Sequence, residues 1–135
     1  MIFVDTGAFL ARWVEKDQFH RRAQGAWKEL ERRPEGVFTS NFVLDETLTL
    51  LARRTSYTFS AERAEALYSS RLLTILRPQT ADELGAVDLF RKLAGQEVSF
   101  TDAVSFVLMR RHGFTRAFTF DRYFAAAGFE VWPAT

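Results

Sequence analysis

The sequence contains no cysteine, which excludes both a disulfide-stabilised scaffold and a zinc site built from cysteine ligands. Proline is scarce, with 3 residues, and the 7 glycines are scattered singly. This composition leaves no flexible linker or low-complexity segment that would divide the chain. We therefore expect one domain over residues 1–135, which is long enough to bury a substantial hydrophobic core.

Long hydrophobic runs are also missing. The stretch from Ala103 to Met109, which includes Ser105, is among the longest, and it is far shorter than the ~20 residues of a membrane-spanning helix. The N-terminus shows no basic segment followed by a hydrophobic stretch, the pattern of a secretory signal. We therefore expect a cytoplasmic protein with no membrane association.

The charges balance closely, with 18 Lys and Arg against 17 Asp and Glu and a net charge of +1. This balance argues against a nucleic-acid-binding protein, because such proteins usually carry a clear basic excess. The sequence lacks a glycine-rich phosphate loop and a Gly-x-Ser-x-Gly motif, which disfavours nucleotide-binding folds with such loops and serine hydrolases of the α/β class.

Short segments rich in β-forming residues alternate with longer helical patterns. Strands are predicted at residues 2–4, 37–39, 72–76, 117–120 and 129–132, and helices at residues 6–13, 19–31, 41–54, 60–70, 80–94, 101–112 and 122–127. This alternation is typical of an α/β fold with a parallel sheet.

Several residues mark the expected ends of these elements. The segment from Pro34 to Gly36 breaks the second helix, while Gly95, Gly113 and Gly128 can each end a helix. The helix at 60–70 has two possible places. It pairs with the helix at 41–54 as a protruding hairpin that buries Ala61, Ala64, Leu67 and Tyr68 against a partner chain, or it packs on its own sheet.

Four acidic residues are predicted to meet at one edge of this sheet. In an open parallel sheet, ligands bind beyond the carboxyl ends of the strands. Asp5 and Asp121 each follow a predicted strand, Asp102 begins a predicted helix, and Glu46 lies about one and a half turns into another. We expect these side chains to lie close together.

Each acid also has a simpler structural explanation. Asp5 and Asp121 could cap helix N-termini, and Ser99 and Asp102 have the spacing of a capping box. Glu46 and its neighbour Asp45 could both be solvated, and helical periodicity does not distinguish them. Convergence of all the acids, however, would require a cation, because the carboxylates would repel one another. Oxygen ligands without cysteine suit Mg²⁺ or Mn²⁺, which catalyse phosphate-ester hydrolysis.

These residues resemble the PIN-domain ribonucleases, and within them the VapC-type toxins of bacterial toxin–antitoxin pairs. The resemblance covers nearly the whole chain. The matching segments are Phe3-Val4-Asp5-Thr6, Asp17-x-x-His20-x-x-Ala23, Thr39-Ser40 through Val43 to Glu46-x-x-x-x-Leu51, Ser99-Phe100-Thr101-Asp102-Ala103, and Thr119-Phe120-Asp121-Arg122-x-Phe124.

The resemblance implies a three-layer α/β/α fold with a central parallel sheet of four or five strands. It places the catalytic, metal-binding acids at Asp5, Glu46 (in preference to Asp45), Asp102 and Asp121, with Mg²⁺ or Mn²⁺ as cofactor. Thr119 matches a hydroxyl that positions water or substrate, and we expect similar positioning roles for Thr6 and Arg122. Many relatives have a small polar residue where this chain has Gly7, so no side-chain contact is expected there. An RNA substrate, a small antitoxin and a homodimer are also implied.

The sequence thus predicts a metal-dependent endoribonuclease that forms the toxin of a toxin–antitoxin system. The alternative is a catalytically weak or inactive module whose acidic pocket receives a basic side chain of a partner. Metal-free catalysis by His20 and His112 is disfavoured because nothing in the sequence ties them to one site. A haloacid-dehalogenase-type phosphatase is disfavoured by Gly7, and a receiver domain by the lack of a lysine after Lys92. If four acids form a metal site, the rest of the chain is basic, and near-neutrality no longer argues against RNA.

Overall fold

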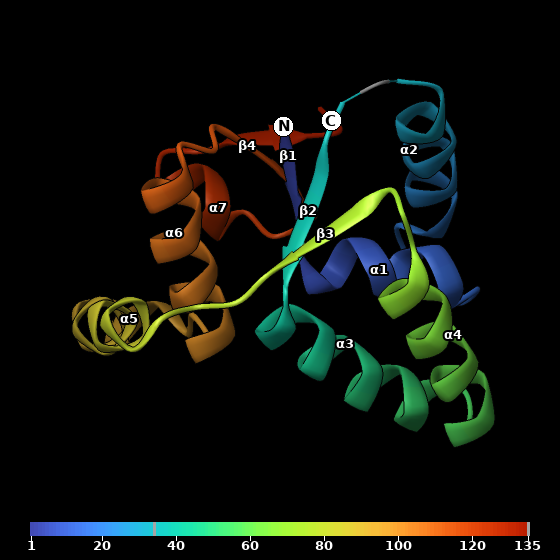
Figure 1. Ribbon diagram of the computed structural model, residues 1–135, viewed down its shortest axis with the longest axis horizontal. Helices are drawn as coiled ribbons and strands as arrows, with labels where there is room; N and C mark the ends of the chain where they lie inside the picture. Colours follow the sequence, from blue (N-terminus) through green and yellow to red (C-terminus); the bar gives the residue numbers. More distant parts are fainter. Residues whose placement is uncertain (34, 135) are drawn as a thin grey trace.

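A central sheet lies between two layers of helices in the computed structural model, which describes residues 1–33 and 35–134 (Figure 1). Along the chain, the elements are β1 (Ile2–Val4), α1 (Thr6–Trp13), α2 (His20–Arg32), β2 (Val37–Ser40), α3 (Asn41–Arg54), α4 (Tyr57–Ser69), β3 (Leu73–Leu76), α5 (Thr80–Lys92), a 3₁₀ turn (Ala94–Gln96), α6 (Phe100–His112), β4 (Arg116–Phe118), α7 (Tyr123–Ala126) and β5 (Glu130–Trp132).

Every strand pairing in the sheet is parallel, and the strand order is β3-β2-β1-β4-β5. The chain thus builds outward from β1 through β2 and β3, then returns to the other side of β1 for β4 and β5. The predicted three-layer α/β/α fold is confirmed, with five strands in the part of the chain that the structure describes. The order reverses between β1 and β4, which is where open parallel sheets usually bind ligands.

Aromatic residues fill the space between the sheet and the helices on both sides. On the side of α2, the Trp27 ring lies 5.1 Å from the Phe118 ring between centroids. On the other face, Phe114, just after α6, packs edge-on against Phe3 and Phe38 at 6.0 and 5.0 Å. The residues of β1 are fully buried as a result. This burial explains why β1 reads as an unbroken apolar run and does not alternate.

The boundary of β4 corrects the sequence prediction. The strand ends at Phe118, whereas residues 117–120 were predicted as strand, so Thr119 and Phe120 lie in the connection to α7. The physical reason is a local hydrogen bond: the Asp121 N–H donates to the Thr119 hydroxyl at 3.0 Å and turns the chain. A turn, and not the strand, therefore positions Thr119 and Asp121.

Two helix boundaries differ from the prediction by two residues or more. Helix α4 begins at Tyr57 and not at residue 60, because the Ser56 hydroxyl caps it by accepting the Phe59 N–H at 3.0 Å. Helix α5 ends at Lys92, and the left-handed residue that follows the 3₁₀ turn is Glu97, with φ 56°, so the expected role of Gly95 is wrong.

Other boundary predictions are confirmed. Gly113 and Gly128 adopt left-handed conformations, with φ of 75° and 99°. The predicted break at Pro34 lies outside the described residues.

Helices α3 and α4 form the predicted hairpin, which Figure 1 shows extending below the sheet. The Ser60 hydroxyl ties them together by donating to the Leu48 carbonyl at 2.7 Å. Leu67 joins the core of this chain, whereas Ala61 and Tyr68 stay exposed, so burial of this face against a partner chain stays a prediction.

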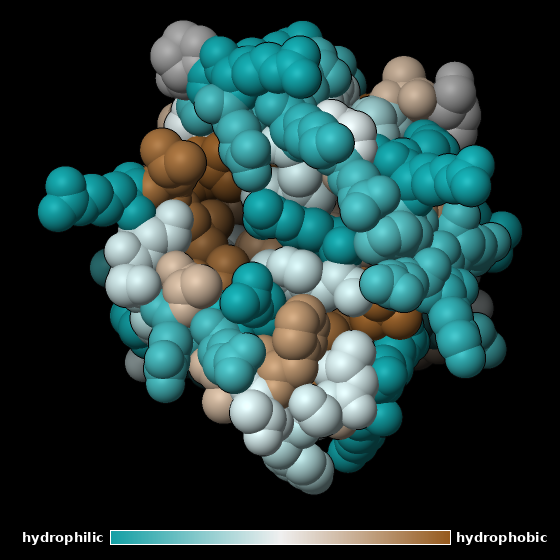
Figure 2. All heavy atoms as spheres, turned by 90° about the vertical axis from the view of Figure 1, so that its right-hand side faces the viewer, coloured by the Kyte–Doolittle hydropathy of each residue, from teal (hydrophilic) through white to brown (hydrophobic). Residues whose placement is uncertain are grey.

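The face formed by α2 and α4 is mostly hydrophilic, with a hollowed hydrophobic area (Figure 2). A cavity of about 220 Å³ lies between these helices and the strands β2 and β3, with Trp27, Leu30, Leu67 and Leu73 in its wall. Within residues 1–33 and 35–134, no helix has the length and apolar character needed to cross a bilayer.

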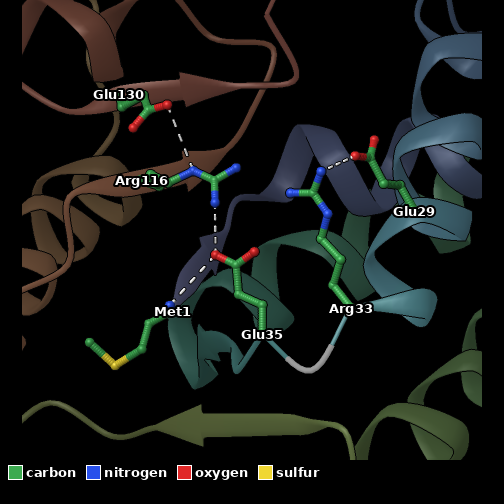
Figure 3. A network of polar contacts seen from close by, with 6 residues as sticks. All are labelled: Met1, Glu29, Arg33, Glu35, Arg116 and Glu130. Carbon is green, nitrogen blue, oxygen red and sulfur yellow. Dashed lines mark hydrogen bonds and ion pairs between the residues drawn. The ribbon is translucent and has the colours of Figure 1, made fainter.

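Ion pairs join the strands at the amino edge of the sheet. Glu35 Oε1 accepts a hydrogen bond from Arg116 Nη1 at 2.9 Å and lies 3.5 Å from the amino group of Met1 (Figure 3). Arg116 Nε also lies 3.8 Å from Glu130 Oε1. These residues begin or precede β1, β2, β4 and β5, so the network fastens the end of the sheet away from the acidic residues.

Candidate active site

Three of the four predicted acids meet beyond the carboxyl ends of β1 and β4. Asp5, Asp102 and Asp121 each offer a carboxylate oxygen, and these oxygens all lie within 4.8 Å of one another. Asp5 joins β1 to α1, Asp102 is the third residue of α6, and Asp121 lies between β4 and α7. The fold therefore brings together residues separated by almost the whole chain.

Asp5 does not cap the helix that follows it. It occupies the N-cap position of α1, but its side chain makes no capping hydrogen bond. Instead, Oδ2 accepts a hydrogen bond from the Thr119 hydroxyl at 2.9 Å. The other oxygen, Oδ1, is buried and has no hydrogen-bond partner among the residues that the structure describes. The capping explanation for Asp5 is thus wrong, and one of its oxygens is left for a ligand.

The other two aspartates combine a structural role with membership of the cluster. The Ser99 hydroxyl caps α6 by accepting the Asp102 N–H at 3.0 Å, as the capping spacing predicted. Asp121 Oδ1 accepts the Tyr123 N–H at 2.9 Å and so holds the start of α7. Capping and convergence are therefore compatible, because the capping bond of Asp102 uses only its backbone N–H, and Asp121 has a second carboxylate oxygen.

The structure also separates the neighbours Glu46 and Asp45. Glu46 lines a groove of about 620 Å³ together with all three aspartates of the cluster. Asp45 instead lines a different hollow, between α3 and α4, with Tyr57 and Tyr68. Periodicity alone does not make this distinction, because it depends on where α3 lies relative to α6. Glu46 is outside the group of oxygens within 4.8 Å, so its place is beside the cluster.

Burial and mutual repulsion hold protons on the cluster. Burial raises the pKa of Asp5 from 3.8 to about 8, and the charge of Asp102 adds to the effect against the opposing hydrogen bond from Thr119. Burial likewise raises the pKa of Asp102 to about 6, with contributions from the charges of Asp121 and Glu46. Full ionisation of the cluster at neutral pH therefore needs a neutralising cation.

The residues present fit a divalent cation with a preference for oxygen ligands. They supply carboxylate oxygens at one point, and a buried oxygen of Asp5 lacks any other partner in the described parts of the chain. Mg²⁺ and Mn²⁺ are typically bound by a few carboxylates and several waters. The geometry of the cluster thus fits a divalent cation.

Of the residues expected to position water or substrate, Thr119 has the clearest contacts with the acidic cluster. Its hydroxyl donates to Asp5 and accepts the Asp121 N–H, so it links two members of the cluster. Thr6 and Arg122 both line the groove, Thr6 as a buried residue and Arg122 as an exposed one.

The groove also contains residues that sequence reasoning did not assign to the site. Asp17, Phe19, Arg54 and Phe120 line it, and Asp17 Oδ2 lies 3.9 Å from Arg54 Nη1. Asp17 belongs to a segment that carried the family resemblance, which is the one signal that could have found it.

The two histidines do not form a site. His20 Nδ1 lies 2.7 Å from the Ala11 carbonyl oxygen, so its ring joins α2 to α1. His112 is the last residue of α6 and packs against Phe114. Neither is among the described residues that line the groove.

The family model of the PIN domain matches residues 2–130. The chain belongs to the PIN domain family. It is 42% identical over 137 residues to the 23S rRNA-specific endonuclease VapC20 of Mycobacterium tuberculosis, and the alignment covers 98% of this chain and 99% of that protein. The resemblance inferred from the sequence is therefore confirmed.

Two solved structures also superpose on this chain. The crystal structure of M. tuberculosis VapC20, described as a toxin that cleaves the sarcin–ricin loop, matches with a TM-score of 0.87 and 36% identity, covering 96% of each chain. FitAcB from Neisseria gonorrhoeae matches with a TM-score of 0.67 and 21% identity, over 97% of this chain and 96% of that one. The second likeness concerns the fold alone.

Proposed function

We propose that this PIN-domain chain is a metal-dependent endoribonuclease and the toxin of a toxin–antitoxin pair. The observation that carries the proposal is the meeting of Asp5, Asp102 and Asp121 around a buried, unpartnered carboxylate oxygen. The identity of 42% with a ribosomal-RNA endonuclease over nearly the whole chain supports the same activity. The protein would act in the cytoplasm.

In this proposal, Asp5, Asp102 and Asp121 hold Mg²⁺ or Mn²⁺, and Glu46 contributes through water. The bound ion supplies the Lewis acidity and positive charge that phosphodiester hydrolysis requires. Glu46 accepts a proton from the attacking water at its carboxylate, and Thr119 holds the Asp5 carboxylate in place. Water oxygen bonds to phosphorus, the bond from phosphorus to the 3′ oxygen breaks, and the departing 3′ oxygen takes a proton from solvent, so the products carry a 5′-phosphate and a 3′-hydroxyl.

The proposed substrate is a structured ribosomal RNA. The solved structure of M. tuberculosis VapC20, which is 36% identical to this chain, is described as that of a toxin that cleaves the sarcin–ricin loop. This stem-loop of 23S rRNA is therefore the first substrate to test. Arg54 and Arg122 on the groove wall would contact phosphates near the cleaved bond. Recognition of such an RNA rests on shape and backbone contacts, with bases read where they are unstacked.

The alternative function, an inactive module that binds a basic side chain, is not favoured by the comparisons. An antitoxin that inserts an Arg or Lys among the acids remains a partner that we propose alongside catalysis. It would neutralise the same carboxylates as the metal ion and would thereby inhibit the enzyme.

We also propose that the chain forms a homodimer through α5. Leu84 and Phe90 on this helix are 63% and 43% exposed, and Val87 between them is 40% exposed. Apolar side chains gathered on one helix are typical of an association surface. Light scattering should give a dimer mass for the unmodified chain and a monomer mass for Leu84→Glu.

The test of activity is cleavage of a sarcin–ricin stem-loop RNA by the isolated chain in the presence of Mg²⁺ or Mn²⁺. Asp5→Asn and Asp102→Asn should each lower the rate at least ~100-fold, and excess EDTA should abolish it. The matched control is Glu29→Gln, because Glu29 pairs with the exposed Arg33 and is not among the described residues that line the groove. Full activity in EDTA, or in either cluster variant, would refute the proposal.

A further inference from the structure

A second cleft adjoins the acidic groove. Its volume is about 420 Å³, and it shares Phe19, Phe120, Asp121 and Arg122 with the groove. The rest of its wall consists of Arg22, Thr119, Ala125, Val131, Pro133 and Ala134. The cleft therefore begins at a member of the metal-binding cluster and extends away from it along β5 and α7.

Two stacked aromatic rings stand between the groove and the cleft. The rings of Phe19 and Phe120 lie 4.7 Å apart between centroids with an angle of 4° between their planes. Both residues are half-buried, and both line the two hollows. They come from opposite ends of the chain, so only the fold creates this pair. Aromatic residues at the edge of an open hollow offer surfaces on which a flat ligand can stack.

An arginine lies over the same pair of rings. The Arg22 guanidinium carbon is 5.3 Å from the centre of the Phe120 ring and 5.8 Å from that of Phe19. Its hydrogen bonds to the Pro133 and Ala134 carbonyls are long, at 3.4 and 3.5 Å. These weak bonds leave the guanidinium able to turn toward a phosphate or to stack on a planar ring.

These features define the chemistry of the occupant. Phe120, Val131 and Pro133 provide an apolar wall, Arg22 and Arg122 provide positive charge, and Asp121 connects the cleft to the proposed metal site. A ligand that suits the apolar wall, the arginines and the neighbouring metal site has flat apolar faces. It also carries a negatively charged group next to these faces and is linked to a group at the metal. A nucleobase next to a phosphodiester has these properties.

We propose that this cleft binds the base of the nucleotide that adjoins the cleaved phosphate, with Phe120 and Phe19 as its stacking surface and Arg22 over its phosphate side. The proposal rests on the RNA-cleaving function proposed above and adds a specificity-determining site to it. A base seated in the cleft must leave its own helical stack, so the site selects RNA with an unstacked nucleotide at the cut.

Fluorescence of 2-aminopurine tests the proposal directly, because stacking on an aromatic ring quenches this base analogue. The probes are short RNA oligonucleotides with one 2-aminopurine moved through successive positions, bound to Asp102→Asn protein with Mg²⁺ so that cleavage does not intervene. We expect strong quenching at one position. Adding Phe120→Leu should remove that quenching and weaken binding about 10-fold, since stacking on an aromatic side chain contributes ~1–3 kcal/mol.

An oligonucleotide that lacks the base at this position distinguishes stacking from a general structural effect. Asp102→Asn protein should bind it about 10-fold more weakly than the intact oligonucleotide, whereas the protein that also carries Phe120→Leu should bind the two equally. Equal binding of both oligonucleotides by the Asp102→Asn protein would overturn the proposal. Arg22→Gln provides a second variant at an exposed side chain, and it should weaken binding and lower its dependence on salt.

The chain offers a matched control for these variants. Arg63 lies over the Phe59 ring at 5.3 Å, which copies the Arg–Phe contact at a place that lines neither the groove nor the cleft. Phe59→Leu and Arg63→Gln should leave quenching and affinity unchanged, and an equal loss in these controls would contradict the proposal.

Turnover separates this inference from the function on which it rests. Phe120→Leu should raise KM and reduce base preference next to the cut while retaining most of kcat. If the unmodified chain cleaves no RNA but still quenches the probe, the endonuclease proposal fails and the base-binding cleft stands. If cleavage is normal and no position is quenched, the reverse holds.

Discussion

The Thr119 hydroxyl donates a hydrogen bond to Asp5 Oδ2 at 2.9 Å, although the two residues lie 114 positions apart in the chain. The same hydroxyl accepts the Asp121 N–H at 3.0 Å. One side chain thus holds the carboxylate that follows β1 and the backbone of the acid that follows β4. This link orients the proposed metal ligands and favours the charged form of Asp5.

Replacing Thr119 tests whether this hydroxyl positions Asp5. Thr119→Val keeps the shape of the side chain but removes the hydrogen bonds, so we expect metal affinity and cleavage rate to fall about 10- to 100-fold. Thr119→Ser keeps the hydroxyl and should retain most of both. Calorimetric titration with Mn²⁺ measures the affinity, and equal behaviour of the two variants would contradict the positioning role.

The raised pKa values of Asp5 and Asp102 predict how stability depends on pH without metal. Folding favours the protonated acids, so their contribution to stability is complete below about pH 4 and is lost as pH rises through about 6 and 8. In EDTA at pH 8, Asp5→Asn should therefore melt about 5 °C or more above the unmodified chain, and the difference should vanish near pH 4.

Metal binding should oppose this loss of stability. A divalent ion binds the ionised carboxylates, so its affinity should increase as pH rises from 5 to 8, and saturating Mg²⁺ should raise the Tm of the unmodified chain but not of Asp5→Asn. Thermal melts with Mg²⁺ and with EDTA across this range provide the measurement. A melting temperature that changes neither with pH nor with added metal would show that the cluster is uncharged and binds no ion.

The neighbours Glu46 and Asp45 make a paired test of the groove. Glu46→Gln removes a carboxylate beside Asp102 and should lower kcat about 10- to 100-fold, because a proton acceptor and outer metal partner is lost. Asp45→Asn changes a side chain that lines another hollow and should leave kcat within twofold. A larger effect at Asp45 would show that the other face of α3 meets the substrate.

The ion pairs at the amino edge of the sheet should matter for stability and not for chemistry. Glu35 is 14% exposed and pairs with Arg116, which is 22% exposed, so Glu35→Gln should destabilise the fold by ~1–3 kcal/mol. Glu29 pairs with Arg33 at about 47% exposure, and Glu29→Gln should cost less than ~0.5 kcal/mol. Urea unfolding measures both, and kcat should stay unchanged in each variant.

The sequence alone determined the order of the elements and the identity of the acids. The apolar run at Ile2–Val4, the glycines at 113 and 128, and the alternation of strands with helices are local signals, so they could be read without coordinates. The sequence also identifies the acids that the structure gathers, because strand ends and the family motifs mark them. Boundaries that depend on one hydroxyl, as at Ser56 and Thr119, were misplaced by two or three residues.

Only the tertiary structure decided what these residues do together. The resemblance prefers Glu46 to Asp45, but only the structure shows the physical reason, because the two residues line different hollows. Only the structure shows that Asp5 Oδ1 is buried without a partner among the described residues. The stacked pair of Phe19 and Phe120 has no signal in the sequence, because its members are 101 residues apart and each reads as an ordinary core residue. Such sites arise from contacts between segments that are distant in the sequence. The local pattern of residues in each segment carries no information about how far apart the two segments lie in the fold or how they are oriented.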